Sequence, residues 1–218
     1  MGAGTVRSTN LARPRPDPGT PRTTGIDKLD VPAIELRVPG PRHGDGSGVV
    51  GDLVGDDRHH GGADKAVYAF AREELDRWEV ELGRPLRDGV FGENLTTEGI
   101  DLDGLEPGRE LRVGTALLQV SLPRQPCATF ARHLGEPRWT RRFTEHGACG
   151  VYLRVLTPGR VVPGDPVRLG ASPGHGVSMR VTFAAAMGDD EAAARVLAAG
   201  CLPATYHAAL QRRLERRG

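Results

Sequence analysis

The sequence is poor in aromatic residues and has no excess charge of either sign. Aromatic residues make up 5% of the 218 positions, whereas glycine and proline number 30 and 17. The formal net charge is +1 and the pI is near 7.8, which gives no electrostatic footprint for nucleic acid. No hydrophobic run approaches the length of a membrane span. We therefore expect a turn-rich β architecture, with neither a nucleic-acid nor a membrane partner.

Cysteine is scarce and unpaired. The three cysteines, Cys127, Cys149 and Cys201, are odd in number and include no CxxC pair. Because disulfide frameworks and zinc sites normally use paired cysteines, we expect three free thiols and no structural zinc. No apolar signal segment opens the chain, so we expect a cytoplasmic protein.

Lysine is almost absent. The 29 basic residues include only two lysines, Lys28 and Lys65. Codon composition can explain the bias, and chance can explain the two survivors. Lysine and arginine are not interchangeable at a specific site, however, so both positions are candidates for a specific role.

The segment Ser121–Cys127, Ser-Leu-Pro-Arg-Gln-Pro-Cys, is the centre of our interpretation. Its two prolines prevent a helix, and it follows an alternating segment, 116–121, that is typical of a half-buried strand. Cys127 should therefore lie on a stiff, extended segment close to Arg124. A nearby cation lowers a thiol's pKa, and the thiolate is both a nucleophile and a soft metal ligand. A buried, inert cysteine is an equally good interpretation of this heptapeptide alone.

Short strands separated by turns predict a β-barrel or sandwich. The segments 105–114 and 161–170 repeat one pattern, in which a Pro-Gly turn feeds a short strand. Further strands are expected at 5–11, 33–38, 49–54, 116–121 and 149–156.

Helices are expected outside this β-rich part. An apolar stripe from Val67 to Leu82 predicts a helix with Asp64 as its N-cap. Ser178, Asp189 or Asp190, and Pro203 begin three further helices. We expect one domain at 1–170 and a helical appendage at 177–218, within the size that one core can support.

Two further motifs carry candidate binding residues. His59 and His60 precede a diglycine ahead of the expected helix, whose N-terminus would offer N–H groups to an anion. Asn94 lies in a glycine-punctuated segment, and its amide suits the edge of a heterocycle. Taken alone, these motifs fit a surface loop and a turn better than a site.

Taken together and in order, these motifs resemble the MOSC family, the C-terminal domain of molybdenum cofactor sulfurases, and most of all its YiiM-like branch. The resemblance spans about 5–170, and the final helices match that branch's three-helix tail. The motifs that carry it are Gly25-Ile-Asp-Lys28, Gly55-Asp-Asp-Arg-His-His-Gly-Gly62, Asp64-Lys65, Phe91-Gly-Glu-Asn-Leu-Thr96 and Pro123-Arg-Gln-Pro-Cys127.

The resemblance implies a mixed β/α fold, namely a closed β-barrel with peripheral helices and a short C-terminal three-helix appendage. It also implies a molybdenum cofactor (molybdopterin) with Cys127 as the catalytic metal ligand. Positions that would line the cofactor pocket are Lys28, His59, His60, Lys65, Asn94 and Arg124. For studied members it implies reduction of N-hydroxylated small molecules, part of a detoxification role, with electrons from a separate flavin or iron–sulfur reductase.

Other functions remain open. The chain could be a non-enzymatic carrier of the cofactor or of sulfur, or a metal-free cysteine hydrolase with a histidine base. A pyridoxal-phosphate enzyme ranks last, because only Lys28 and Lys65 could form the Schiff base.

Overall fold

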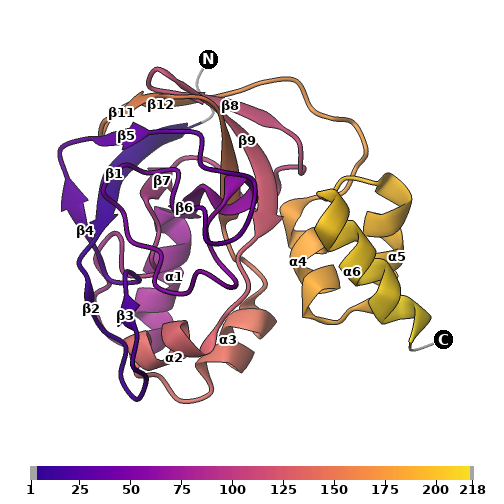
Figure 1. Ribbon diagram of the computed structural model, residues 1–218, viewed down its shortest axis with the longest axis horizontal. Coiled ribbons are helices and arrows are strands. Elements are labelled where there is room, and N and C mark those ends of the chain that lie inside the picture. The colour runs from indigo at the N-terminus through magenta and orange to yellow at the C-terminus, as the bar shows by residue number, and fades with distance from the viewer. Residues whose placement is uncertain (1–3, 217–218) are drawn as a thin grey trace.

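Seven strands close into a barrel in the computed structural model, which describes residues 4–216 (Figure 1). The strands are β1 (Gly4–Ala12), β6 (Val67–Ala71), β7 (Leu95–Glu98), β8 (Glu110–Val113), β9 (Ala116–Pro123), β10 (Val151–Thr157) and β12 (Pro166–Leu169). Their order is β12-β8-β9-β10-β6-β7-β1, and pairing of β1 with β12 closes the ring. Only β6 and β7 run parallel among these pairs, so the barrel is mixed. The expected closed barrel with peripheral helices is confirmed.

Shorter strands extend the barrel at its rim. β4 (Lys28–Val31) pairs with the second half of β1, and β5 (Ile34–Leu36) pairs with β11 (Gly159–Val161). β2 (Arg15–Pro16) and β3 (Thr23–Thr24) form a small hairpin. The predicted strand at 49–54 is wrong, because only Val49 makes a bridge, to Leu36, and the rest of that segment is loop.

The two repeated Pro-Gly segments become neighbours. Their strands, β8 and β12, pair antiparallel with Arg168 opposite Arg112. Leu111, Val113 and Val167 face the core, whereas the two arginines are exposed. A side-chain period of two therefore explains the apolar-Arg-apolar pattern.

The predicted helix at Val67–Leu82 is half wrong. Its first five residues form the central strand β6, and helix α1 is Arg72–Leu82. All five residues of β6 are buried, so the strand is apolar on both faces and its sequence mimics a helical stripe. Asp64 caps nothing, since it lies in a 3-10 turn, Ala63–Lys65, and forms an ion pair with Arg154 at 2.7 Å.

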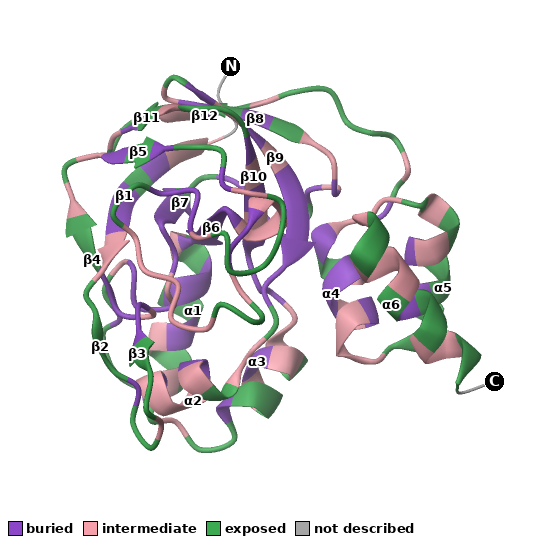
Figure 2. Cartoon of the chain, in the orientation of Figure 1, coloured by how far each residue is buried: buried purple, intermediate pink, exposed green. Residues whose placement is uncertain are grey.

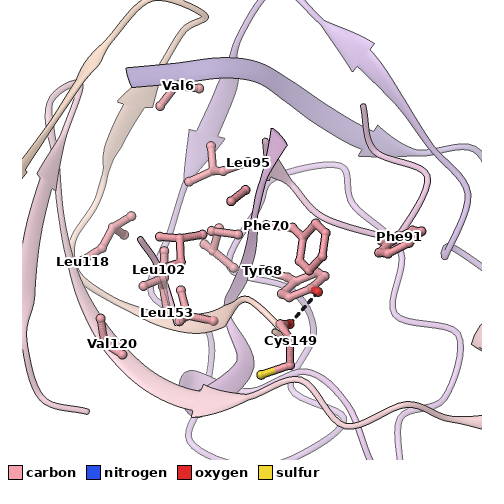
Figure 3. Packing of buried hydrophobic residues seen from close by; sticks show 14 of the residues in the cluster. Val6, Tyr68, Phe70, Phe91, Leu95, Leu102, Leu118, Val120, Cys149 and Leu153 are labelled. Atoms are coloured by element: carbon pink, nitrogen blue, oxygen red, sulfur yellow. Dashed lines mark hydrogen bonds between the residues drawn. The ribbon is translucent and has the colours of Figure 1, made fainter. Parts of the chain in front are cut away.

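Most of the large aromatic residues form one cluster among helices α1, α2 and α3. Trp78 of α1 packs against Trp139 and Phe143 of α3 (Trp139–His146), and Phe91 and Phe130 complete the cluster. Phe130 comes from α2 (Ala128–Leu134). The cluster continues into the barrel interior, which is purple in Figure 2 and enlarged in Figure 3.

Three helices follow the barrel, α4 (Met179–Met187), α5 (Asp190–Ala199) and α6 (Ala204–Glu215). Ser178 and Asp189 cap α4 and α5 as expected, each accepting a hydrogen bond from a backbone N–H of the first turn. The side chains of Met179 and Phe183 on α4 are buried in the barrel's core. Helices α5 and α6 pack on the other face of α4, where a second and smaller group of buried residues lies. No helix within residues 4–216 is long and apolar enough to cross a membrane.

Candidate functional site

One cavity, which we call the first cavity, collects residues from well-separated parts of the chain. It holds about 790 Å³ of empty space, counted to its open mouth. This cavity is lined by six of the residues that the sequence predicted for the site, namely Lys28, His60, Lys65, Asn94, Arg124 and Cys127. His59 lines a neighbouring cavity instead. The β2–β3 hairpin and the loop at 52–56 form much of the remaining wall, to which Tyr68 and Tyr152 also contribute.

Cys127 lies where strand β9 gives way to helix α2. Its backbone is extended, with φ −129° and ψ 168°, because two prolines keep the chain from coiling before α2 begins at Ala128. Its thiol is free and half-buried. Cys149 is also free but fully buried, and burial raises its pKa well above the usual value, which keeps that sulfur an inert thiol. Cys127 is the cysteine that the cavity presents.

Arg124 is a buried cation that forms no ion pair with the residues that the structure describes. Only 4% of the residue is exposed, and the guanidinium lies 4.1 Å from the ring centroid of Phe130 and 5.2 Å from that of Tyr68. Its Nε has no hydrogen-bond partner, and no carboxylate within residues 4–216 forms an ion pair with it. Leaving a buried charge unpaired is costly, so the cavity is complementary to an anion that the chain itself does not supply.

Lys65 and His60 stand on the border of the first cavity. The Lys65 ammonium donates to the backbone oxygen of His59 at 2.8 Å. Burial, together with the charge of Arg124, lowers the pKa of Lys65 to about 8. Burial and the charge of Lys65 lower the pKa of His60 to about 4, so that its imidazole is neutral near pH 7.

Lys28 and Asn94 belong to an internal network rather than offering free groups. The buried Lys28 ammonium pairs with Asp52, at 2.5 Å and 2.6 Å to its two carboxylate oxygens. The Asn94 amide donates to Asp52 at 2.9 Å, and its oxygen accepts from the backbone N–H of Tyr68 at 3.2 Å. These contacts join strands β4 and β6 to the loop at Asp52 and to the turn before β7, at the cavity wall. Sequence reasoning missed Asp52, although a buried lysine requires a nearby acid.

The His-His-Gly-Gly motif acts differently from the expectation. A 3-10 turn and a strand follow it, so the predicted helix N-terminus for an anion is wrong. The glycines serve close packing of loops, because Gly62 has φ +77° and a Cβ there would lie 2.2 Å from the backbone oxygen of Arg42. His59 is exposed, and its Nδ1 contacts Asp56 at 3.2 Å.

The β2–β3 hairpin contributes residues that sequence reasoning also missed. Asp17 is buried and is held by a bidentate pair to Arg132, at 2.9 Å and 2.6 Å, and by Thr129 at 2.9 Å. The hydrogen bond from Arg132 lowers the pKa of Asp17, although burial opposes that shift. Arg22, from the same hairpin, pairs with Asp56 at 3.1 Å. The hairpin is therefore tied to α2 and to the 52–56 loop on either side of the cavity.

Within residues 4–216, no group of three or more His, Cys, Asp or Glu side chains could hold a metal ion by itself. A metal at Cys127 would therefore need its other ligands from a bound group. The fold and the site define a closed mixed β-barrel with a cavity that is lined by a free thiol and by a buried arginine without an ion-pair partner.

The comparisons assign the family. The family model of the MOSC domain matches residues 56–168. The chain is 36% identical to the uncharacterized protein YflK of Bacillus subtilis (strain 168) over 177 residues, which cover 80% of this chain and 77% of YflK. It is 31% identical to the protein YiiM of Escherichia coli (strain K12) over 172 residues, 76% of each chain. The chain belongs to the MOSC domain family.

Two further matches extend the comparison. The crystal structure of YiiM from Geobacillus stearothermophilus superposes with a TM-score of 0.76 at 28% identity, covering 97% of this chain and 99% of that one. A protein of Gibberella moniliformis (strain M3125 / FGSC 7600) named "Reductase" is 32% identical over 135 residues, 60% of this chain but only 24% of that protein.

Proposed function

We propose that this protein binds a molybdenum cofactor in the first cavity and reduces N-hydroxylated compounds, for example N-hydroxylated purines. Membership of the MOSC family and a distant relative named a reductase support this proposal. The observation that carries it is that a free thiol, Cys127, and a buried cation without an ion-pair partner, Arg124, line one cavity. A thiolate suits a thiophilic metal, and a buried guanidinium suits the phosphate of a pterin cofactor.

The residues present fit such a group. Cys127 would be a ligand of the metal, Arg124 would hold the cofactor's anionic end, and Lys65 would add a second positive charge. Lys28 and Asn94 would shape the wall through Asp52 rather than touch the anion with free donors. When bound, the cofactor would supply two-electron redox chemistry.

The reaction balances as one N-hydroxylamine, two electrons and two protons giving one amine and water. The electrons would come from a separate flavin or iron–sulfur reductase in the cytoplasm. The name of the relative called "Reductase" supports a reductive role, and the matching segment makes up about a quarter of that larger protein.

Metal and cofactor content of the purified protein tests the proposal. Protein from a host that makes the cofactor should contain molybdenum, and it should reduce an N-hydroxylated purine when supplied with a chemical reductant. Cys127→Ser replaces the sulfur by a harder oxygen and should abolish turnover. Arg124→Ala should lower cofactor content, since a charge-assisted contact contributes about 1.5–3 kcal/mol. Cys201→Ser is the matched control. Cys127 lines both the first cavity and the neighbouring cavity that contains His59, whereas Cys201 lines neither of them.

Three other outcomes would reject this function. Equal turnover of wild type and Cys127→Ser would remove the ligand role of Cys127. Full cofactor loading without turnover would indicate a carrier. Alkylation-sensitive hydrolysis without molybdenum would indicate a cysteine hydrolase.

A further inference from the structure

The β2–β3 hairpin, residues 13–24, forms part of the wall of the first cavity but has no buried apolar anchor. Four of its residues line the cavity, namely Asp17, Arg22, Thr23 and Thr24. Within 13–23, Asp17 is the only buried residue, and all four prolines of this segment are exposed. Segments without buried apolar contacts open locally at a lower free energy than the core. The hairpin is therefore the part of the wall that opens most easily.

The contacts of one carboxylate, which we call the latch, hold the hairpin against helix α2. The Asp17 carboxylate accepts hydrogen bonds from Nε and Nη2 of Arg132, at 2.9 Å and 2.6 Å, and from the Thr129 hydroxyl at 2.9 Å. Both partners lie on α2, which is next to the hairpin in Figure 1. Only 3% of the Asp17 side chain is exposed, so its charge depends on these donors as long as the hairpin is closed.

Two further ion pairs attach the hairpin, and both involve exposed arginines. Arg15 pairs with Asp27 at 3.3 Å and contacts the ring of His133. Arg22 pairs with Asp56 at 3.1 Å. The two arginine side chains are 43% and 45% exposed, and ion pairs of exposed side chains contribute little to stability. The latch is therefore the main contact that keeps the hairpin closed.

The other walls of the first cavity belong to the fixed part of the fold. Tyr68 lies on the fully buried strand β6, and Tyr152 lies on its neighbour β10. The buried ion pair of Lys28 and Asp52 fixes the loop beside the hairpin. Arg124, which is 4% exposed, lines the same cavity and attracts an anion into it. Movement of the hairpin is thus the least costly way to admit a ligand to Arg124 and to cover it.

We propose that the β2–β3 hairpin is a gate of the first cavity, opened by release of the latch and closed over an anion bound at Arg124. The inference rests on the proposed function for one point, the identity of that anion as the cofactor. A ligand that binds only the closed form stabilises it by mass action, so the gate should open less often when the cavity is occupied. Arg132 lines neither the first cavity nor the neighbouring cavity at His59, so its effect on a bound ligand would act through the hairpin.

Trypsin cleavage measures opening of the gate in cofactor-free, full-length protein. Trypsin cuts after arginine but not before proline, and Arg13 and Arg15 each precede a proline. The bond between Arg22 and Thr23 is therefore the one cleavable bond in the hairpin, and mass spectrometry follows the fragment that begins at Thr23. Urea unfolding of each variant gives its global stability. Cleavage through local opening should rise much less steeply with urea than global unfolding does.

Two variants break the latch. Asp17→Asn removes the carboxylate charge and should raise the cleavage rate about tenfold, which corresponds to about 1.4 kcal/mol. Arg132→Met should raise it further, because it leaves the carboxylate buried without a charged partner until the hairpin opens. Arg142→Met is the matched control, since Arg142 also donates two hydrogen bonds to a carboxylate, that of Glu81, at 3.1 Å and 2.8 Å. That pair joins α3 to α1, so the cleavage rate of the control should match wild type.

Inorganic phosphate is the anion that tests closure. Phosphate added to cofactor-free wild type should slow cleavage at Arg22 several-fold, whereas sodium chloride at equal ionic strength should not. Arg124→Met lacks the cation that would bind the anion, so phosphate should not slow its cleavage.

Retention of the cofactor tests the same gate in loaded protein. Molybdenum content is measured during dialysis of protein from a host that makes the cofactor. Arg132→Met should lose molybdenum several-fold faster than wild type and Arg142→Met. Loaded wild type should also be cleaved more slowly at Arg22 than cofactor-free wild type.

Each arm of the test has its own failure. Wild-type cleavage that follows global unfolding, or equal rates in wild type, Asp17→Asn and Arg132→Met, would overturn the gate. Phosphate that leaves wild-type cleavage unchanged would overturn closure over an anion, and equal rates of molybdenum loss would overturn closure over the cofactor. Wild type that never contains molybdenum would contradict the proposed function, while the trypsin and phosphate results would still decide on the gate.

Discussion

Arg124 places the needs of binding and of stability in conflict. Its guanidinium is desolvated against Phe130 and Tyr68, its Nε has no hydrogen-bond partner, and it forms no ion pair within residues 4–216. Arg124→Met keeps the length of the side chain and removes the buried charge. We expect this variant to raise the free energy of unfolding of cofactor-free protein by about 1–3 kcal/mol and to lower cofactor content at the same time.

Urea unfolding of cofactor-free protein, paired with metal analysis of protein purified from a cofactor-making host, checks this prediction. Arg154→Met is the matched control. Arg154 is paired with Asp64 at 2.7 Å and with Gln119 at 2.9 Å, so its loss should destabilise the fold. A destabilised Arg124→Met would mean that the cation is compensated within the protein.

The buried His133 should make the folded protein less stable at acidic pH. Its Nε2 is 2.9 Å from the backbone oxygen of Val90, and its Nδ1 faces the guanidinium of Arg15, so the neutral ring satisfies both contacts. Burial and the charge of Arg15 lower its pKa from 6.5 to about 4. The unfolded chain therefore binds this proton first, and the free energy of unfolding should fall as the pH drops from about 6.5 to about 4.

His133→Gln removes this titration and should flatten the dependence over that range, measured by urea unfolding at pH 7, 6, 5 and 4. His60, with its pKa also lowered to about 4, contributes in the same direction, whereas the buried Glu93, whose pKa burial raises to about 7, contributes in the opposite direction. His207→Gln on helix α6 is the control. An unchanged slope in His133→Gln would contradict the assignment of a neutral buried ring.

At the scale of single helices and strands, the predictions that depended on a few neighbouring residues were correct, whereas a prediction that depended on burial in the fold was wrong. The helix caps at Ser178 and Asp189 were predictable, because a cap depends on one side chain and the first turn after it. The strand β6 was not, because Val67–Ala71 is buried on both faces and has no polar alternation to mark it. Its continuation into α1 then made one long apolar stripe.

The cap of α5 gives a test at this scale. The Asp189 carboxylate accepts from the backbone N–H of Ala192 at 2.9 Å. Asp189→Ala should lower the free energy of unfolding by about 0.5–2 kcal/mol, whereas Asp189→Asn should restore most of it. Hydrogen exchange should show the loss in the first turn of α5 and not in the barrel. Uniform loss of protection would mean that the whole molecule, rather than α5 alone, depends on this cap.

The sequence identified which residues belong to the candidate site, but it did not predict which residues they contact. Cys127 and Arg124 were identified from a proline-rich segment whose stiffness is a local property. The pairing of Lys28 with Asp52 joins strand β4 to a loop 24 residues away, and the tie between Asp17 and Arg132 joins segments 115 residues apart. Barrel closure brings such residues together, and no sequence spacing encodes that closure. Their individual roles in binding stay predictions.

At the scale of the whole molecule, the C-terminal helices are unequal parts of the fold. Phe183 and Met179 of α4 are buried in the barrel's core, whereas Ala193, Val196 and Leu210 of α5 and α6 form a separate small cluster. In Figure 1, α4 lies between the barrel and the other two helices. The predicted domain boundary at 170–177 therefore separates α4 from a core to which it contributes side chains.

Two truncations test this division. A chain ending at Gly188 keeps α4 and should retain a folded barrel with near-UV circular dichroism close to wild type and a reduced Tm. A chain ending at Gly170 also removes Phe183, and loss of a buried phenylalanine alone costs about 3–5 kcal/mol. We expect that chain to aggregate or to lose its near-UV signal. If both chains melt alike, α4 adds nothing to the barrel.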